Sequence, residues 1–256
     1  MAFLPPDITL MVLLAASLAA FLAGVIKGMV GFAMPMVMIS LLGSFLSPEL
    51  ALAGLIMPTL ATNGVQALRE GPSAAGRALR DFRVFLIVGA LALVVGAQMV
   101  TLLPAKILLM MIGGPILFFA VLQLTGWQPR PSERHPNATQ AGVGAVAGFI
   151  GGMSGIWGPP TVMLLTALNT PKTAQMRIQG VIYGLGAVAL AAAHIGSGVL
   201  TLRTGLFSAL LVPAALLGMR VGMRFSDRFD QATFRRATLA VLVIAALNLL
   251  RRALVM

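Results

Sequence analysis

The sequence contains no cysteine, which excludes disulfides, thiol catalysis and thiolate metal sites. It is also poor in charge, since only 10% of its 256 residues are charged, against about 25% in a typical soluble domain. Hydrophobic residues make up 59% of the chain, and its mean hydropathy is +0.97. Such a chain must face lipid over much of its surface, so we predict an all-α polytopic membrane protein.

Acidic residues are absent from the apolar segments. All seven fall in predicted loops or segment ends: Asp7, Glu49, Glu70, Asp81, Glu133, Asp227 and Asp230. Carriers coupled to sodium or protons often place a carboxylate inside the membrane, so this absence argues against a carboxylate proton relay. It also removes paired-carboxylate catalysis from consideration. Ser154 has no nearby His–Asp pair in the sequence, and we expect no enzyme, no metal site and no cofactor.

Basic residues outnumber acidic ones by 18 to 7, which gives a formal net charge of +11. In a polytopic membrane protein, surplus Lys and Arg usually mark cytoplasmic loops that lie beside anionic lipid headgroups. We therefore expect the lipid bilayer and its anionic headgroups as partners, and no nucleic acid.

Apolar runs, divided at Pro, Gly and charge clusters, predict five helical segments in each half of the chain. They cover residues 8–24, 32–46, 50–68, 83–103 and 106–124, then 138–151, 156–168, 176–198, 204–220 and 234–250. A helix needs about 20 residues to cross the hydrocarbon layer. The first two segments of each half are short for this, so they are either tilted spans or the arms of a re-entrant hairpin.

Basic residues indicate the orientation. If successive segments cross the membrane in opposite directions, thirteen of the eighteen basic residues lie on one side of it. They are Arg69, Arg77, Arg80, Arg83, Arg130, Arg134, Lys172, Arg177, Arg220, Arg224, Arg228, Arg235 and Arg236. The opposite side receives four: Lys106, Arg203, Arg251 and Arg252. By the positive-inside rule, the Arg-rich loops are predicted to be cytoplasmic.

A glycine-rich motif occurs once in each half. "AGVIKGMVGFAMP", residues 23–35, aligns without gaps on "AGFIGGMSGIWGP", residues 147–159. Each half has five segments, an odd number, so the second half starts on the opposite side of the membrane from the first. The second copy is therefore predicted to be inverted relative to the first. We predict two inverted repeats, each a Gly/Pro-broken helical hairpin followed by three transmembrane helices. Their bounds are 1–128 (hairpin 8–46, helices 50–124) and 138–256 (hairpin 138–168, helices 176–250), with a cytoplasmic linker at 129–137.

Glycine and proline at these two positions predict interrupted helices. A break leaves helix-end N–H groups without partners, which hydrocarbon tolerates only where the backbone lines a cavity or is buried in protein. Inverted repeats with broken helices are a recurring design of secondary transporters, and the exposed N–H groups favour an anion. The alternative is that the glycines serve close helix packing, as GxxxG motifs do.

The expected substrate-binding residues lie at the breaks or on the helices that follow them. They are Lys27, Gly28, Met29, Gly31, Asn63, Gly152, Met153, Ser154, Gly155, Trp157 and Gln179. The glycines would let the backbone approach the substrate, and Ser154 would donate a hydrogen bond. Lys27, placed inside the first break, either pairs with an anion or extends its ammonium to the headgroups. Trp157 either forms a wall of the substrate pocket or only packs against neighbouring helices.

The motifs "GVIKGMVGFAMPMVM" and "GGMSGIWGPPTVMLLTALNTPKTAQMR" resemble those of the sulfite exporter TauE/SafE family. The resemblance covers nearly the whole chain, although Phe32 and Ala33 stand where the family more often has glycines. It implies transport of a small sulfur-containing anion, such as sulfite, sulfoacetate or a related organosulfonate, across the bacterial inner membrane. An anion channel and a non-transporting membrane assembly protein are the alternatives, and a homo-oligomer is left open.

Overall fold

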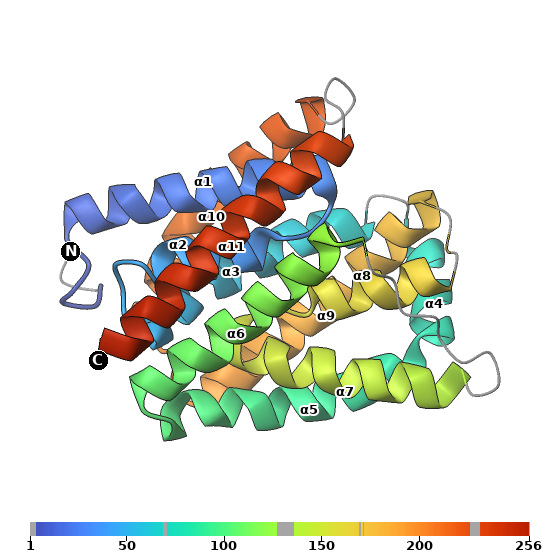
Figure 1. Cartoon of the computed structure of the whole chain (residues 1–256), viewed down its shortest axis with the longest axis horizontal. Helices are drawn as coiled ribbons and strands as arrows, with labels where there is room; N and C mark the ends of the chain where they lie inside the picture. The colour runs from blue at the N-terminus through green and yellow to red at the C-terminus, as the bar shows by residue number, and fades with distance from the viewer. Residues whose placement is uncertain are drawn as a thin grey trace.

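Eleven α-helices make up the part of the chain that the computed structural model describes, which is residues 4–68, 71–126, 136–168, 170, 172–225 and 231–255 (Figure 1). No strand occurs among these residues. The helices are α1 (Leu10–Val30), α2 (Met34–Leu42), α3 (Pro48–Leu68), α4 (Pro72–Asp81), α5 (Arg83–Leu102), α6 (Ala105–Leu124), α7 (Pro136–Ser154), α8 (Gly158–Ala167), α9 (Lys172–Gly196), α10 (Leu202–Phe225) and α11 (Gln231–Val255).

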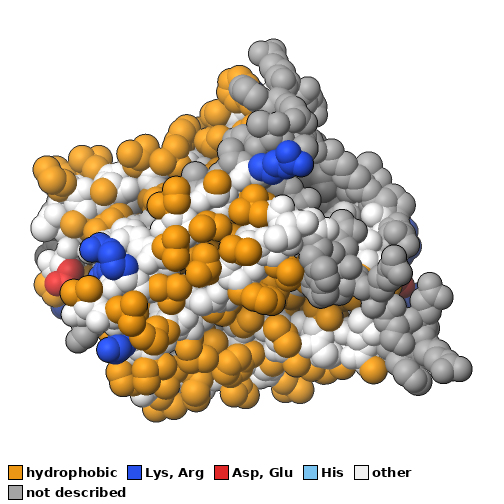
Figure 2. All heavy atoms as spheres, viewed as in Figure 1, with side chains coloured by type: hydrophobic (Ala, Val, Ile, Leu, Met, Phe, Trp, Pro, Cys, Tyr) orange, Lys and Arg blue, Asp and Glu red, His pale blue; other side chains and the backbone are white. Residues whose placement is uncertain are grey.

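Within the part of the chain that the structure describes, six helices are long and apolar enough to cross a membrane: α1, α3, α5, α6, α9 and α10. Figure 2 shows hydrophobic side chains across the middle of one face, with the visible Lys and Arg side chains toward the left end and beside the grey atoms on the right. The prediction of an all-α polytopic membrane protein is confirmed. By contrast, α2 and α8 have only 9 and 10 residues, which is at most about half of the 20 or so that a crossing helix needs.

The predicted ends of the first segment in each half are wrong. We expected helix ends near residues 24 and 151, but α1 continues to Val30 and α7 continues to Ser154. The glycines that suggested earlier ends lie inside the helices because another helix crosses them at close range. A β-carbon at Gly24 would lie 2.3 Å from the Ala215 carbonyl oxygen, and one at Gly148 would lie 2.0 Å from that of Gly89.

The helices of the two halves pair with exchanged partners. In the first half α1 packs along α10, and in the second half α7 packs along α5. The two helices that follow the short arms, α3 and α9, pack against each other at the centre, and the last helices of the halves, α6 and α11, form a further pair (Figure 1). Each half therefore completes its packing only with helices of the other half.

The loop predicted between residues 69 and 83 contains a helix, α4, that was not predicted from the apolar runs. Its 10 residues were too few and too polar to be found by hydropathy. The helix is strongly amphipathic, with Ala78 buried while Arg77 and Arg80 are exposed. Most of the predicted linker 129–137 lies outside the described residues, as do Arg69, Arg130, Arg134 and Arg228.

Candidate functional site

Both predicted interruptions exist, and each begins at a glycine with left-handed backbone geometry. Gly31 ends α1 with φ 81°, and its N–H bonds to the Lys27 carbonyl oxygen at 2.7 Å. Gly155 ends α7 with φ 72°, and its N–H bonds to the Gly151 carbonyl oxygen at 2.7 Å. Glycine adopts this conformation without the steric cost that a β-carbon brings, so these two positions stop the helices.

The first break also holds a strained residue, Ala33, with φ 74°. A non-glycine residue in this region costs about 1–2 kcal/mol. Such strain concentrates at functional sites, where surrounding structure holds the residue in place. Ala33 is buried at the start of α2 and lines the cavity described next.

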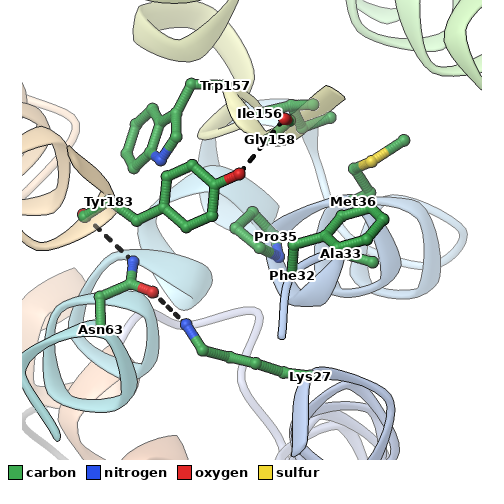
Figure 3. Close-up of a pocket in the computed structure, with 10 residues that line it drawn as sticks. All are labelled: Lys27, Phe32, Ala33, Pro35, Met36, Asn63, Ile156, Trp157, Gly158 and Tyr183. Carbon is green, nitrogen blue, oxygen red and sulfur yellow. Dashed lines mark hydrogen bonds between the residues drawn. The ribbon is translucent and has the colours of Figure 1, made fainter. Parts of the chain in front are cut away.

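The two breaks meet at one small cavity (Figure 3). Its lining comes from both breaks, from α1 and α2, and from the central pair α3 and α9: Lys27, Phe32, Ala33, Pro35, Met36, Asn63, Ile156, Trp157, Gly158 and Tyr183. The free volume is about 10 Å³, which is room for about one water molecule. Residues separated by more than 120 positions thus line the same small cavity.

A chain of hydrogen bonds crosses this cavity. The Lys27 ammonium donates to the Asn63 side-chain oxygen, and the Asn63 amide nitrogen donates to the Tyr183 carbonyl oxygen at 3.2 Å. The Tyr183 hydroxyl donates to the Gly158 carbonyl oxygen at 3.2 Å (Figure 3). The chain therefore links the end of α1 to the start of α8 through the central helices α3 and α9.

Lys27 is the one charged side chain in the cavity lining. It lies in the last turn of α1 and not inside the break, where it was predicted. Only 2% of its surface is exposed, and its ammonium is bonded inside the protein, so the headgroup-directed alternative is wrong. Its hydrogen-bond partner is a neutral amide. A buried ammonium has three donors, and a negatively charged solute would supply the missing counter-charge.

The breaks offer fewer backbone donors than expected. Proline has no N–H, and the first turn of α8 contains both Pro159 and Pro160. The Thr161 N–H bonds to the Trp157 carbonyl oxygen, which leaves Gly158 as the one donor of that turn outside intrahelical bonding. In α2, Pro35 likewise removes one of the first three donors. Lys27 therefore brings more hydrogen-bond donors to this cavity than the two helix starts do.

Several predicted site residues lie beside the cavity without lining it. Gly28 and Gly152 contact the backbones of α10 and α5, as the packing alternative expected. The Ser154 hydroxyl donates to the Ile150 carbonyl oxygen at 2.7 Å and accepts from the Ile156 N–H at 3.2 Å, so its bonds are local. The remaining three are buried within helices, namely Met29, Met153 and Gln179. Their contact with substrate stays a prediction.

His194 has a positioning role at the second break. Its imidazole is fully buried, and Nε2 donates to the Gly152 carbonyl oxygen at 2.8 Å. Because the helix stops at Ser154, this carbonyl has no partner within α7. The other ring nitrogen bonds to the Ser197 hydroxyl at 3.1 Å. His194 therefore ties the end of α7 to α9.

Seven lining residues were not among the predicted site residues, and Tyr183 is the most informative of them. It is the only tyrosine of the chain. Tyr183 precedes a glycine on α9, as Asn63 does on α3. The Asn63–Gly64 and Tyr183–Gly184 pairs therefore indicated that the two residues occupy similar positions on the matching helices of the two halves. The other six carry no polar side chain, and nothing in their local sequence distinguished them from core residues: Phe32, Ala33, Pro35, Met36, Ile156 and Gly158.

Two halves of crossing helices, two interrupted hairpins and a buried cation at their meeting point define a polytopic membrane protein with a transporter-like centre. The family model for the sulfite exporter TauE/SafE matches residues 16–249, and the chain belongs to this family. It is thus a multi-pass membrane transporter for sulfite or a related anion, and the family resemblance seen in the sequence is confirmed. Neither the curated proteins nor the solved structures gave a match.

Proposed function

We propose that the protein is a secondary transporter that carries a small sulfur-containing anion, either sulfite, sulfoacetate or a related organosulfonate, across the bacterial inner membrane. The anion is held between the two helix breaks, and its negative charge faces the Lys27 ammonium. The observation that carries this proposal is a single buried ammonium, bonded to a neutral amide, in a cavity lined by both breaks. The Arg-rich loops face the cytoplasm.

Alternating access is favoured by the size of the cavity. A sulfur oxyanion is larger than the one water molecule for which the cavity has room, so the anion enters a conformation in which the breaks have moved apart. The exchanged pairing of α1 with α10 and α7 with α5 supports two inverted repeats that rock against each other. A space this narrow between the two breaks supports a carrier over an open channel.

Flux through liposomes tests the proposal. Purified protein in liposomes is expected to take up labelled sulfite at a rate that saturates with concentration and is accelerated by unlabelled sulfite on the other side, because a carrier exchanges bound substrate. The same anions are expected to raise the unfolding temperature, since a ligand stabilises the state that it binds. Non-saturating flux without exchange would identify a channel, and no flux of any tested anion would support an assembly protein.

Gly155→Leu is expected to reduce this flux to background while the protein still inserts and elutes as a single species. A side chain at φ 72° costs about 1–2 kcal/mol, and its β-carbon would lie 2.7 Å from a methyl carbon of Leu55. The second break would then lose its geometry. Gly142→Leu on the same helix is the control, because a β-carbon there meets nothing within 4 Å. Normal transport by folded Gly155→Leu protein would remove this break from the mechanism.

A further inference from the structure

A second and larger cavity lies beside the candidate site, open to the side of the helix bundle. It is a groove between α4, α5, α7 and α9 with a volume of about 370 Å³. Its lining is almost entirely apolar and includes Leu79, Phe85, Leu93, Ile182, Val188 and Trp157. Some of these side chains are well exposed, with Val188 at 55% and Leu79 at 47%. In a membrane protein, such a surface is covered by lipid or by protein.

The groove has the length of one bilayer leaflet. Along α9 it extends from Ile182 to Ala192, and this ten-residue separation corresponds to about 15 Å at about 1.5 Å per residue. The hydrocarbon core is about 30 Å thick, so one leaflet supplies about half of that. On α5 the groove runs from Phe85, near the start of the helix beside α4, to Leu93, near its middle, so an acyl chain lying along α5 would start near α4 and end beside the middle of that helix.

Positive charge gathers at the α4 end of the groove. Three arginines, Arg77, Arg80 and Arg83, occupy the stretch that contains Leu79 and leads to Phe85, and all three are exposed. Asp81 is exposed in the same stretch, so residues 77–83 carry a net charge of 3 − 1 = +2. An amphipathic helix with arginines on its polar face is typical of the membrane interface and attracts anionic lipid headgroups.

Trp157 connects this groove to the candidate substrate site, since its side chain lines both cavities. The indole packs closely against glycines of α7 and α9. A β-carbon at Gly151 would lie 2.5 Å from the ring, and one at Gly186 would lie 3.2 Å from it. A molecule in the groove therefore contacts the side chain that separates the groove from the cavity at the helix breaks.

We propose that this groove binds one anionic phospholipid, with its headgroup phosphate at Arg80 and Arg83 and an acyl chain extending to Trp157. Apolar lining, leaflet length and the charge at one end together match a diacyl lipid with a negative headgroup. The inference does not depend on which anion the protein carries. By filling the groove, the lipid supports Trp157 from the side opposite the substrate cavity.

Fluorescence quenching by brominated lipids tests the proposal. The chain has two tryptophans, so Trp127→Phe leaves Trp157 as the only one. This variant is reconstituted with phosphatidylglycerol or phosphatidylcholine brominated in the middle of the acyl chains. Half-maximal quenching is expected at a mole fraction of brominated phosphatidylglycerol that is at least about fivefold lower than that of brominated phosphatidylcholine. The reason is that each arginine near the surface favours an anionic headgroup by about that factor.

Two sets of variants separate the headgroup from the chain. In the Trp127→Phe background, Arg80→Gln with Arg83→Gln is expected to bring phosphatidylglycerol quenching to the phosphatidylcholine level, while Arg203→Gln, exposed on α10, leaves it unchanged. Ala90→Leu fills the groove and is expected to weaken quenching by both lipids, while Ala15→Leu on exposed α1 surface does not. Equal quenching by both lipids, no quenching, or a preference that survives the arginine variants would each overturn the proposal.

Discussion

Lys27→Met is expected to lower the rate of anion transport by at least about 30-fold while the protein remains folded. Loss of one partner of a buried charge interaction typically costs about 2 kcal/mol or more, and about 1.4 kcal/mol corresponds to a factor of ten. Methionine has a similar length, so the cavity wall keeps its shape. The measurement is uptake of labelled sulfite into liposomes, with the unfolding temperature recorded for each variant.

Lys106→Met is the matched control for this experiment. Lys106 is exposed near the start of α6 and lines neither the cavity nor the groove. Its replacement removes the same charge from the chain and should leave transport within about twofold of the original rate. A folded Lys27→Met variant with the original affinity for the anion would show that the buried ammonium does not bind substrate.

Asn63→Asp is expected to abolish transport while the protein remains folded, because the ion pair that Lys27 gains offsets the hydrogen bond to the Tyr183 carbonyl oxygen that the amide nitrogen loses. The new carboxylate would stand where the Asn63 amide now accepts a hydrogen bond from Lys27, and would give the ammonium a permanent counter-ion. The ammonium and the carboxylate together carry no net charge, so the pair does not attract an anion, and the carboxylate itself repels one. We expect a loss of at least about 30-fold, from the same 2 kcal/mol as for Lys27→Met.

The double variant Lys27→Met with Asn63→Asp distinguishes pairing from general damage. It leaves a buried carboxylate without its cation, which typically costs about 3–5 kcal/mol of stability. Its unfolding temperature should therefore fall well below those of both single variants. If the Asn63→Asp variant transported normally, or if the double variant were as stable as the single ones, Lys27 and Asn63 would not act as a coupled pair.

The sequence predicted the helical membrane class and most segment positions because hydropathy and helix stops are local properties. The breaks themselves were predicted correctly for the same reason, since Gly31 and Gly155 end helices through their own backbone conformation. The predicted helix ends at residues 24 and 151 were wrong because a glycine in the sequence predicts a helix end. Only the structure shows that another helix packs closely against glycines in these segments. The short helix α4 was not predicted because it is polar and lies outside the apolar runs.

The composition of the site was decided by tertiary structure. Lys27 and Asn63 were both expected at the site, yet their hydrogen bond joins residues 36 positions apart on different helices, and the link to Tyr183 spans a further 120. Such contacts depend on how α1, α3 and α9 pack, which no local pattern contains. The sequence by itself determined that two interrupted helices lie in a membrane protein of low charge. Only the packing of one half against the other decided that both interruptions share a cavity with a buried ammonium.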